Sequence, residues 1–91
     1  MELTRQDLRA AIIHALETIL EDEDPAVFTR LDDNERLRSQ IKIDSLDFLD
    51  LVTWVDKTYG YEVPPDDYKQ LSTINAMLDY LLPRLATAKA G

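Results

Sequence analysis

A serine stands between two aspartates, Asp44 and Asp47, in the stretch IDSLDFLD, where the apolar pattern predicts that a helix begins. Asp44 suits the N-cap position of that helix, and Asp47, three residues on, suits the return bond of a capping box. Ser45 would then occupy the first helical position with a free and exposed hydroxyl. Because a helix N-terminus carries partial positive charge and free N–H groups, it would favour a phosphate there. Serine is also common at helix starts without any chemical role, and the Asp-Ser pair alone favours that plainer interpretation.

The helix that begins at Ser45 is expected to run to Tyr59, with Gly60 at its C-terminal cap. Its core face is apolar at spacings of three and four residues and carries Phe48, Leu51, Val52, Val55 and Tyr59. The other face carries Leu46, Asp47, Leu49, Asp50, Thr53, Asp56 and Lys57. Two leucines among carboxylates are typical of a docking surface with apolar anchors and a charged rim. Isolated exposed leucines are nevertheless ordinary on protein surfaces, so this face alone favours no partner.

The rest of the chain predicts further helices around one core. A helix from about Thr4 to Leu20 has Thr4 as its N-cap and an apolar stripe made of Leu8, Ile12, Ala15, Leu16 and Ile19. Residues 21–43 are expected to form a long loop that its own apolar side chains hold in place, with a short helical turn around Asp33–Leu37. A short helix is expected from about Pro65 to Leu71, and a last helix, capped by Ser72 or Thr73, is expected to end at Pro83. The predicted fold class is all-α: a four-helix bundle of three longer helices and one short helix, with a long first loop.

Length and composition indicate one small acidic domain. The 91 residues suit a single domain over 1–91, with an ordered core at about 4–82 and a tail at 83–91. The formal net charge of −8 repels phosphate backbones, so we expect no nucleic-acid partner and expect partners with basic patches. Without a signal-peptide pattern or a long apolar run, the chain is expected to be a cytoplasmic monomer that does not span a membrane. With His14 as its only histidine and no cysteine, it is expected to hold no metal site and to be no enzyme.

Two stretches together, IDSLDFLDLV and YGYEVPPDDYKQLSTINAMLDYL, closely resemble the acyl carrier proteins, which are small acidic four-helix carriers. The likeness covers nearly the whole domain and is strongest from Ile41 to Leu82. In that family the serine of a DSL signature at the start of the second helix carries a 4′-phosphopantetheine arm. The resemblance implies that Ser45 is the attachment residue, with Asp44 as the preceding signature acid and Leu46 as the following apolar residue.

The resemblance further implies how the arm would be attached and used. A separate phosphopantetheinyl transferase would use Mg²⁺ and coenzyme A, and the Ser45 hydroxyl would attack the β-phosphate and release 3′,5′-ADP. The thiol of the arm would then carry an acyl group as a thioester between acyl-loading and acyl-using enzymes with basic patches. These partners would meet Leu46 and a docking face made of Asp47, Leu49, Asp50, Thr53, Asp56 and Lys57. Such contacts are expected to be weak and salt-sensitive.

Several residues depart from the family pattern. Lys42 stands where the signature usually has glycine, Arg36 and Arg38 lie just upstream, and Lys57 lies where acids are usual. These departures suggest a specialised carrier in lipid or secondary metabolite biosynthesis, or one for an unusual acyl group. Phe48 lies on the core stripe where the family tends to have a smaller residue. It is expected either to narrow an internal cavity, so that only short acyl chains are shielded, or to be ordinary packing.

Two other functions remain open at this point. The chain could be an unmodified interaction module that keeps the carrier fold and binds a partner through its second helix, although the intact DSL argues against it. It could also carry aminoacyl or peptidyl groups, which would use the same arm and differ only in the loading enzyme.

Overall fold

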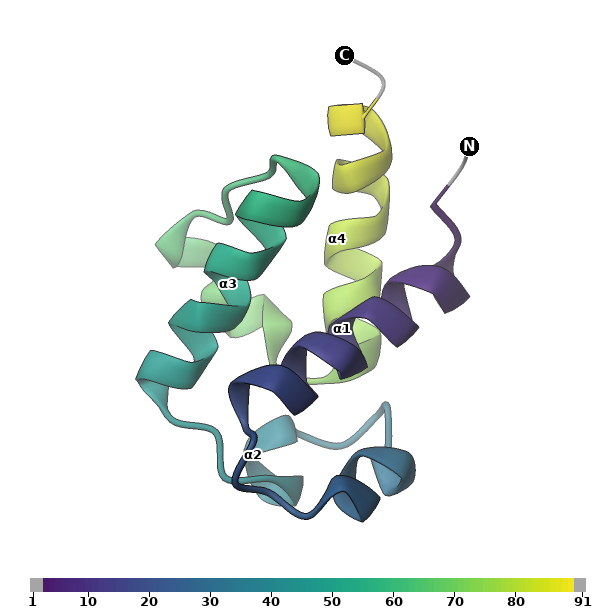
Figure 1. Ribbon diagram of the computed structural model, residues 1–91. Helices are drawn as coiled ribbons and strands as arrows, with labels where there is room; N and C mark the ends of the chain where they lie inside the picture. The colour runs from purple at the N-terminus through teal and green to yellow at the C-terminus, as the bar shows by residue number, and fades with distance from the viewer. Residues whose placement is uncertain (1–2, 90–91) are drawn as a thin grey trace.

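The computed structural model describes residues 3–89, which form three long and three short helices and no strand (Figure 1). In chain order these are α1 (Arg5–Ile19), η1 (Pro25–Arg30), α2 (Leu37–Gln40), α3 (Ser45–Tyr59), η2 (Pro65–Leu71) and α4 (Ile74–Lys89), where η denotes a 3₁₀-helix. Figure 1 shows α3 and α4 side by side, with α1 crossing them obliquely. The prediction of an all-α fold is confirmed. None of these helices is both long and apolar enough to cross a membrane.

The three long helices bury their apolar faces against one another. In α1 the predicted stripe is confirmed, since Leu8, Ile12, Ala15 and Leu16 are buried and Ile19 is partly buried. Thr4 caps this helix by accepting a hydrogen bond from the Asp7 amide at 3.1 Å. Among the described residues the core holds no buried charged side chain, so removal of apolar surface from water is its main source of stability.

The predicted loop at 21–43 is in fact partly helical, and the predicted turn at Asp33–Leu37 is misplaced. The segment forms η1, where Asp24 caps the Ala26 amide ahead of Pro25 at the first position, and then α2, which begins at Leu37. The expectation that its own apolar residues hold it in place is confirmed. The buried side chains of this segment are Phe28, Leu31, Leu37, Ile41 and Ile43.

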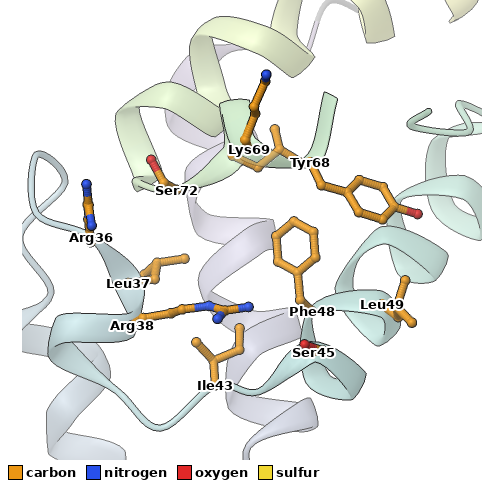
Figure 2. Close-up of a pocket in the computed structure, with 11 residues that line it drawn as sticks. Arg36, Leu37, Arg38, Ile43, Ser45, Phe48, Leu49, Tyr68, Lys69 and Ser72 are labelled. Carbon is orange, nitrogen blue, oxygen red and sulfur yellow. The ribbon is translucent and has the colours of Figure 1, made fainter. Parts of the chain in front are cut away.

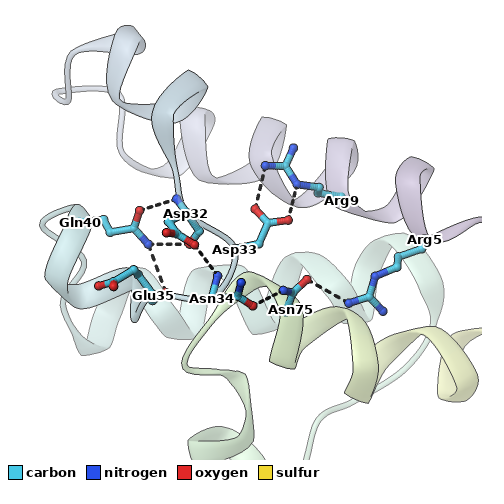
Figure 3. Close-up of polar contacts among 8 residues, drawn as sticks. All are labelled: Arg5, Arg9, Asp32, Asp33, Asn34, Glu35, Gln40 and Asn75. Carbon is cyan, nitrogen blue, oxygen red and sulfur yellow. Dashed lines mark hydrogen bonds and ion pairs between the residues drawn. The ribbon is translucent and has the colours of Figure 1, made fainter.

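Residues 32–35 are held by hydrogen bonds to three helices (Figure 3). Asp32 and Glu35 are bonded to Gln40 of α2, whereas Asp33 and Asn34 are bonded to α1 and α4. Arg9 donates two hydrogen bonds of 2.8 Å to the two carboxylate oxygens of Asp33. The Asn75 amide donates to the Asp33 carbonyl at 3.0 Å, and the Asn75 side chain donates to Asn34. Arg5 completes the network by donating to the Asn75 side chain at 3.0 Å. The chain that leads toward α3 therefore starts from a fixed point on the other two long helices.

The short helix η2 has the bounds predicted from the sequence and is held in place by α4. The buried Tyr80 hydroxyl donates to Asp67 at 2.5 Å, and it lies 3.2 Å from the Tyr61 hydroxyl. Because Tyr80 donates to Asp67, Tyr61 is the donor to Tyr80. Burial, and secondarily the bond to Asp67, raises the pKa of Tyr80, so the phenol stays neutral and remains a donor.

The last helix does not end at Pro83, contrary to the prediction; α4 continues through it to Lys89. Thr73, one of the two predicted caps, accepts from the Ala76 amide at 2.9 Å. Proline removes the hydrogen bond that would reach the carbonyl of Asp79, but Asp79 is exposed, so water can satisfy that oxygen. Beyond the proline, Leu85 is fully buried, and its packing holds the continuing helix on the core. Residues 83–89 of the predicted tail are thus helical, whereas 90–91 lie outside the described residues.

The Arg9–Asp33 ion pair predicts a pH-dependent contribution to stability. The hydrogen bonds from Arg9 hold the pKa of the Asp33 carboxyl below its usual value. Because the folded pKa is the lower one, this stability is fully present above the unfolded pKa of about 4 and is lost as the pH falls through the folded value. Asp33→Asn should therefore lower the free energy of unfolding at pH 7 by about 0.5–1 kcal/mol, a modest figure because both side chains are partly exposed.

Urea unfolding of wild type and Asp33→Asn from pH 7 to pH 3 checks this expectation. The difference between the two proteins should shrink as the pH falls below 4. Asp22→Asn is the matched control, because Asp22 is exposed and makes no hydrogen bond or ion pair within residues 3–89. A difference between wild type and Asp33→Asn that stays constant down to pH 3 would contradict a charge-dependent role.

Candidate functional site

The start of α3 is fixed by two reciprocal hydrogen bonds. The Asp44 carboxylate accepts from the Asp47 amide at 2.8 Å, and the Asp47 carboxylate accepts from the Asp44 amide at 3.2 Å. This is the capping box that the sequence predicts. At the other end, Gly60 caps the helix with φ of 73°, a left-handed conformation that favours glycine. The predicted bounds of this helix, Ser45 to Tyr59, are therefore confirmed.

Ser45 is the first residue of α3, and its side chain is exposed. Within residues 3–89 the Ser45 hydroxyl makes no hydrogen bond, because Asp44 and Asp47 satisfy each other's amides. The hydroxyl is thus available to a reagent from outside, at a helix end that favours negative charge. A serine hydroxyl is a weak nucleophile without a base, and within residues 3–89 no base is hydrogen-bonded to it.

The outward face of α3 is exposed as predicted. Leu46 and Leu49 are 72% and 44% exposed, and they are the large apolar side chains that stand out from the described surface. Asp50, Thr53, Asp56 and Lys57 are also exposed on this helix, while Asp47 is half-buried. On the core side, Leu51, Val52 and Val55 are buried, and Phe48 and Tyr59 are partly buried. The geometry supports a docking role for this face, which stays a prediction.

A groove of about 610 Å³ opens beside Ser45, between the chain that precedes α3, α3 itself and η2 (Figure 2). The chain before α3 contributes Arg36, Leu37, Arg38 and Ile43 to its lining. The first turns of α3 contribute Ser45, Phe48 and Leu49, and the η2 side contributes Tyr68, Lys69, Leu71 and Ser72. Its volume falls within the roughly 300–1,000 Å³ that is usual for sites that bind small molecules.

Phe48 forms part of the groove wall, where its ring meets that of Tyr68 edge to face with centroids 5.3 Å apart. The interior of the bundle, by contrast, has a void of about 10 Å³ lined by side chains such as Ile12, Leu51 and Met77. That volume is about one water-sized probe and cannot accommodate an acyl chain without moving the core. Phe48 does not line this void, so its predicted effect on an internal cavity stays untested, and its contact with Tyr68 shapes the open groove.

Three cationic residues line the groove, and the sequence indicated only part of this arrangement. The sequence places Arg36 and Arg38 just upstream of the Asp-Ser pair, which indicated that they lie near Ser45. It gave no such indication for Lys69, because η2 lies far from α3 in the sequence. A backbone bond from the Leu37 amide to the Ser72 carbonyl, 2.9 Å long, brings these two segments together. Lys42, the other departure from the signature, is exposed and donates its amide to the Glu23 carboxylate at 3.0 Å.

The fold is all-α, and an exposed serine lies at a capped helix start beside a groove. These features are those of a carrier domain. The model of the family described as "Phosphopantetheine attachment site" matches residues 8–81. This match covers most of the chain, so the chain belongs to that family of carrier proteins. A curated protein named acyl carrier protein, from Lactobacillus johnsonii, is 34% identical over 44 residues. Those residues are 48% of this chain and 55% of that relative, so the match spans about half of the relative's length.

The capping box predicts that Asp44 stabilises the fold independently of any chemistry at Ser45. Asp44→Ala removes the acceptor for the Asp47 amide and should lower the free energy of unfolding by about 1–2 kcal/mol. Asp50→Ala is the matched control, since Asp50 is exposed on the same helix, and it should change stability by at most about 0.5 kcal/mol. Urea unfolding at pH 7 measures both. Equal stability of the two variants would show that the box contributes nothing.

Proposed function

We propose that Ser45 is the residue of this carrier that receives 4′-phosphopantetheine and that the arm then carries acyl groups as thioesters. The observation that supports it best is the free, exposed Ser45 hydroxyl at the capped start of α3, beside a groove of about 610 Å³. The family match supports a phosphopantetheine group in general. The serine lies inside the matched residues, and the helix end around it favours the phosphate of the arm.

The attachment step needs a partner enzyme, a phosphopantetheinyl transferase with Mg²⁺ and coenzyme A. The Ser45 oxygen forms a bond to the β-phosphorus of coenzyme A, the bond from that phosphorus to 3′,5′-ADP breaks, and the hydroxyl proton passes to a base of the transferase. In this scheme the chain itself is no enzyme: it presents the hydroxyl, and the start of α3 stabilises the resulting phosphodiester. The arm supplies the thiol that this cysteine-free chain lacks.

The outward face of α3 is the surface we assign to partner enzymes. Leu46 follows Ser45 directly and is 72% exposed, so it is available to a protein that reaches the serine. The exposed carboxylates of Asp50 and Asp56 lie along the same helix and would attract basic patches. The apolar side chains would anchor a partner, and the charged rim would add contacts that salt weakens. Weak contacts suit a carrier that must leave one enzyme for the next.

Mass spectrometry of the intact protein tests the assignment of Ser45. After incubation with coenzyme A, Mg²⁺ and a broad-specificity phosphopantetheinyl transferase, the wild type should gain one phosphopantetheine, and Ser45→Ala should gain none. Ser72→Ala is the matched control, because Ser72 is an exposed serine that lines the same groove, and it should be modified like the wild type. If folded wild type gains no mass with several transferases, the chain is better explained as an unmodified interaction module.

The docking face predicts which substitutions slow this modification. Leu46→Ala should lower kcat/KM of the transferase reaction about tenfold, the loss expected of an interface anchor worth about 1.4 kcal/mol. Stability should not change, because the side chain is largely exposed. Asp50→Asn should raise KM a few-fold at low salt and less at high salt. Asp79→Asn, which makes the same charge change on α4 beside Arg5 and not on α3, should have no effect. Equal kinetics of all three variants would contradict a docking role for α3.

A further inference from the structure

The groove beside Ser45 carries the opposite charge to the chain as a whole. The chain has 18 acidic and 10 basic residues, yet the 11 residues that line the groove include Arg36, Arg38 and Lys69 and no aspartate or glutamate. Glu35, Asp44, Asp47, Asp50 and Asp67 adjoin lining residues in the sequence but do not line the groove themselves. Of these, Asp44 is bonded to the Asp47 amide, and Asp67 accepts a hydrogen bond from Tyr80. The lining is therefore suited to a ligand with negative charge.

The three cations of the groove have no carboxylate partner within residues 3–89. The ion pairs of the described chain are Arg5–Asp79 and Arg9–Asp33, which tie α1 to α4 and to the segment before α2. Figure 2 shows the Arg38 side chain extending from α2 across the groove toward Phe48, while Lys69 points away from the groove floor. Arg38 is thus the cation placed to meet a ligand that enters from Ser45, and guanidinium groups pair with carboxylates through two parallel hydrogen bonds.

The remainder of the lining is largely apolar, with Ile43, Phe48, Tyr68 and Leu71 among its side chains. A ligand that fits this lining has a short apolar stem and an acidic end. The core void lined by Ile12, Leu51 and Met77 measures about 10 Å³ and is too small for the stem. The acyl group is at the far end of the arm, so it reaches Arg38 when the arm attached at Ser45 folds back along the groove that both residues line.

We propose that the groove between α2, α3 and η2 receives an acyl group that ends in a carboxylate, and that Arg38 pairs with this carboxylate. This inference rests on the proposed function, because the acyl group reaches the groove only on an arm attached at Ser45. Arg36 and Lys69 add positive potential at the groove edge. Arg38 is a specificity-determining residue in this proposal, since a neutral acyl group of equal length would not pair with it.

The probe is the protein loaded with a six-carbon dicarboxylic acyl group, adipyl, whose free carboxyl carbon is ¹³C-labelled. A broad-specificity transferase loads it from labelled adipyl-coenzyme A, and the intact mass confirms loading. Titration of the ¹³C signal should give a pKa about 0.5 lower in the wild type than in Arg38→Gln, because a nearby guanidinium favours the charged carboxylate. Arg38 is exposed, and screening by solvent keeps this shift small.

Arg30→Gln is the matched control, because Arg30 is an exposed arginine outside the groove and its loss changes the net charge equally. It should titrate like the wild type. Equal titration of wild type, Arg38→Gln and Arg30→Gln overturns the inference. A ³¹P signal of the arm that moves in Arg38→Gln, with an unchanged ¹³C titration, also overturns it, because Arg38 would then hold the phosphodiester. A protein that gains no mass contradicts the proposed function itself, and the inference falls with it.

Discussion

The reciprocal bonds between Asp44 and Asp47 are the interaction on which the site depends, because they fix the residue at which α3 begins. The starting residue sets the phase of the whole helix. With Asp44 as the cap, Ser45 occupies the exposed first position, Leu46 points outward, and Phe48 turns toward the bundle. A start one residue later would rotate every side chain by about 100° relative to the core. The same two bonds also satisfy groups that could otherwise bond the serine hydroxyl.

The groove exists because separate contacts hold its three walls. The segment before α3 is fixed to α1 and α4 through Asp33 and Asn75, and η2 is fixed to α4 through the bond from Tyr80 to Asp67. The backbone bond between Leu37 and Ser72 joins the two walls on the side away from α3. The groove measures about 610 Å³, whereas the void in the core beneath it measures about 10 Å³, so the space beside the bundle is the one large enough for the tethered group we propose.

The sequence predicted well the elements whose local signals and tertiary packing agree. The bounds of α3, its capping box and its glycine cap follow from side chains within the helix, and the apolar stripe of α1 follows from periodicity. It failed where packing overrode a local rule: Pro83 should end a helix, but the burial of Leu85 keeps α4 continuous. It also failed in residues 21–43, where the start of α2 depends on a bond from the Leu37 amide to Ser72, although η1 begins with the local signals Asp24 and Pro25. The sequence also could not predict that Lys69 lines the groove, because only the fold brings η2 beside α3.

Two surfaces of opposite charge now adjoin one serine: the acidic outward face of α3 and the basic groove behind it. The acidic face suits partner enzymes with basic patches, and the basic groove suits an acidic acyl group. Both roles depend on the central claim that Ser45 carries the phosphopantetheine arm. The most direct test is to treat the wild-type protein with coenzyme A, Mg²⁺ and a phosphopantetheinyl transferase, digest it with trypsin, and sequence the peptides by tandem mass spectrometry. Cleavage after Lys42 and Lys57 isolates residues 43–57, in which Ser45 is the only serine. Phosphopantetheine on Ser45 of that peptide is the predicted result. Modification of Ser39 or Ser72, or of no residue at all, would contradict it.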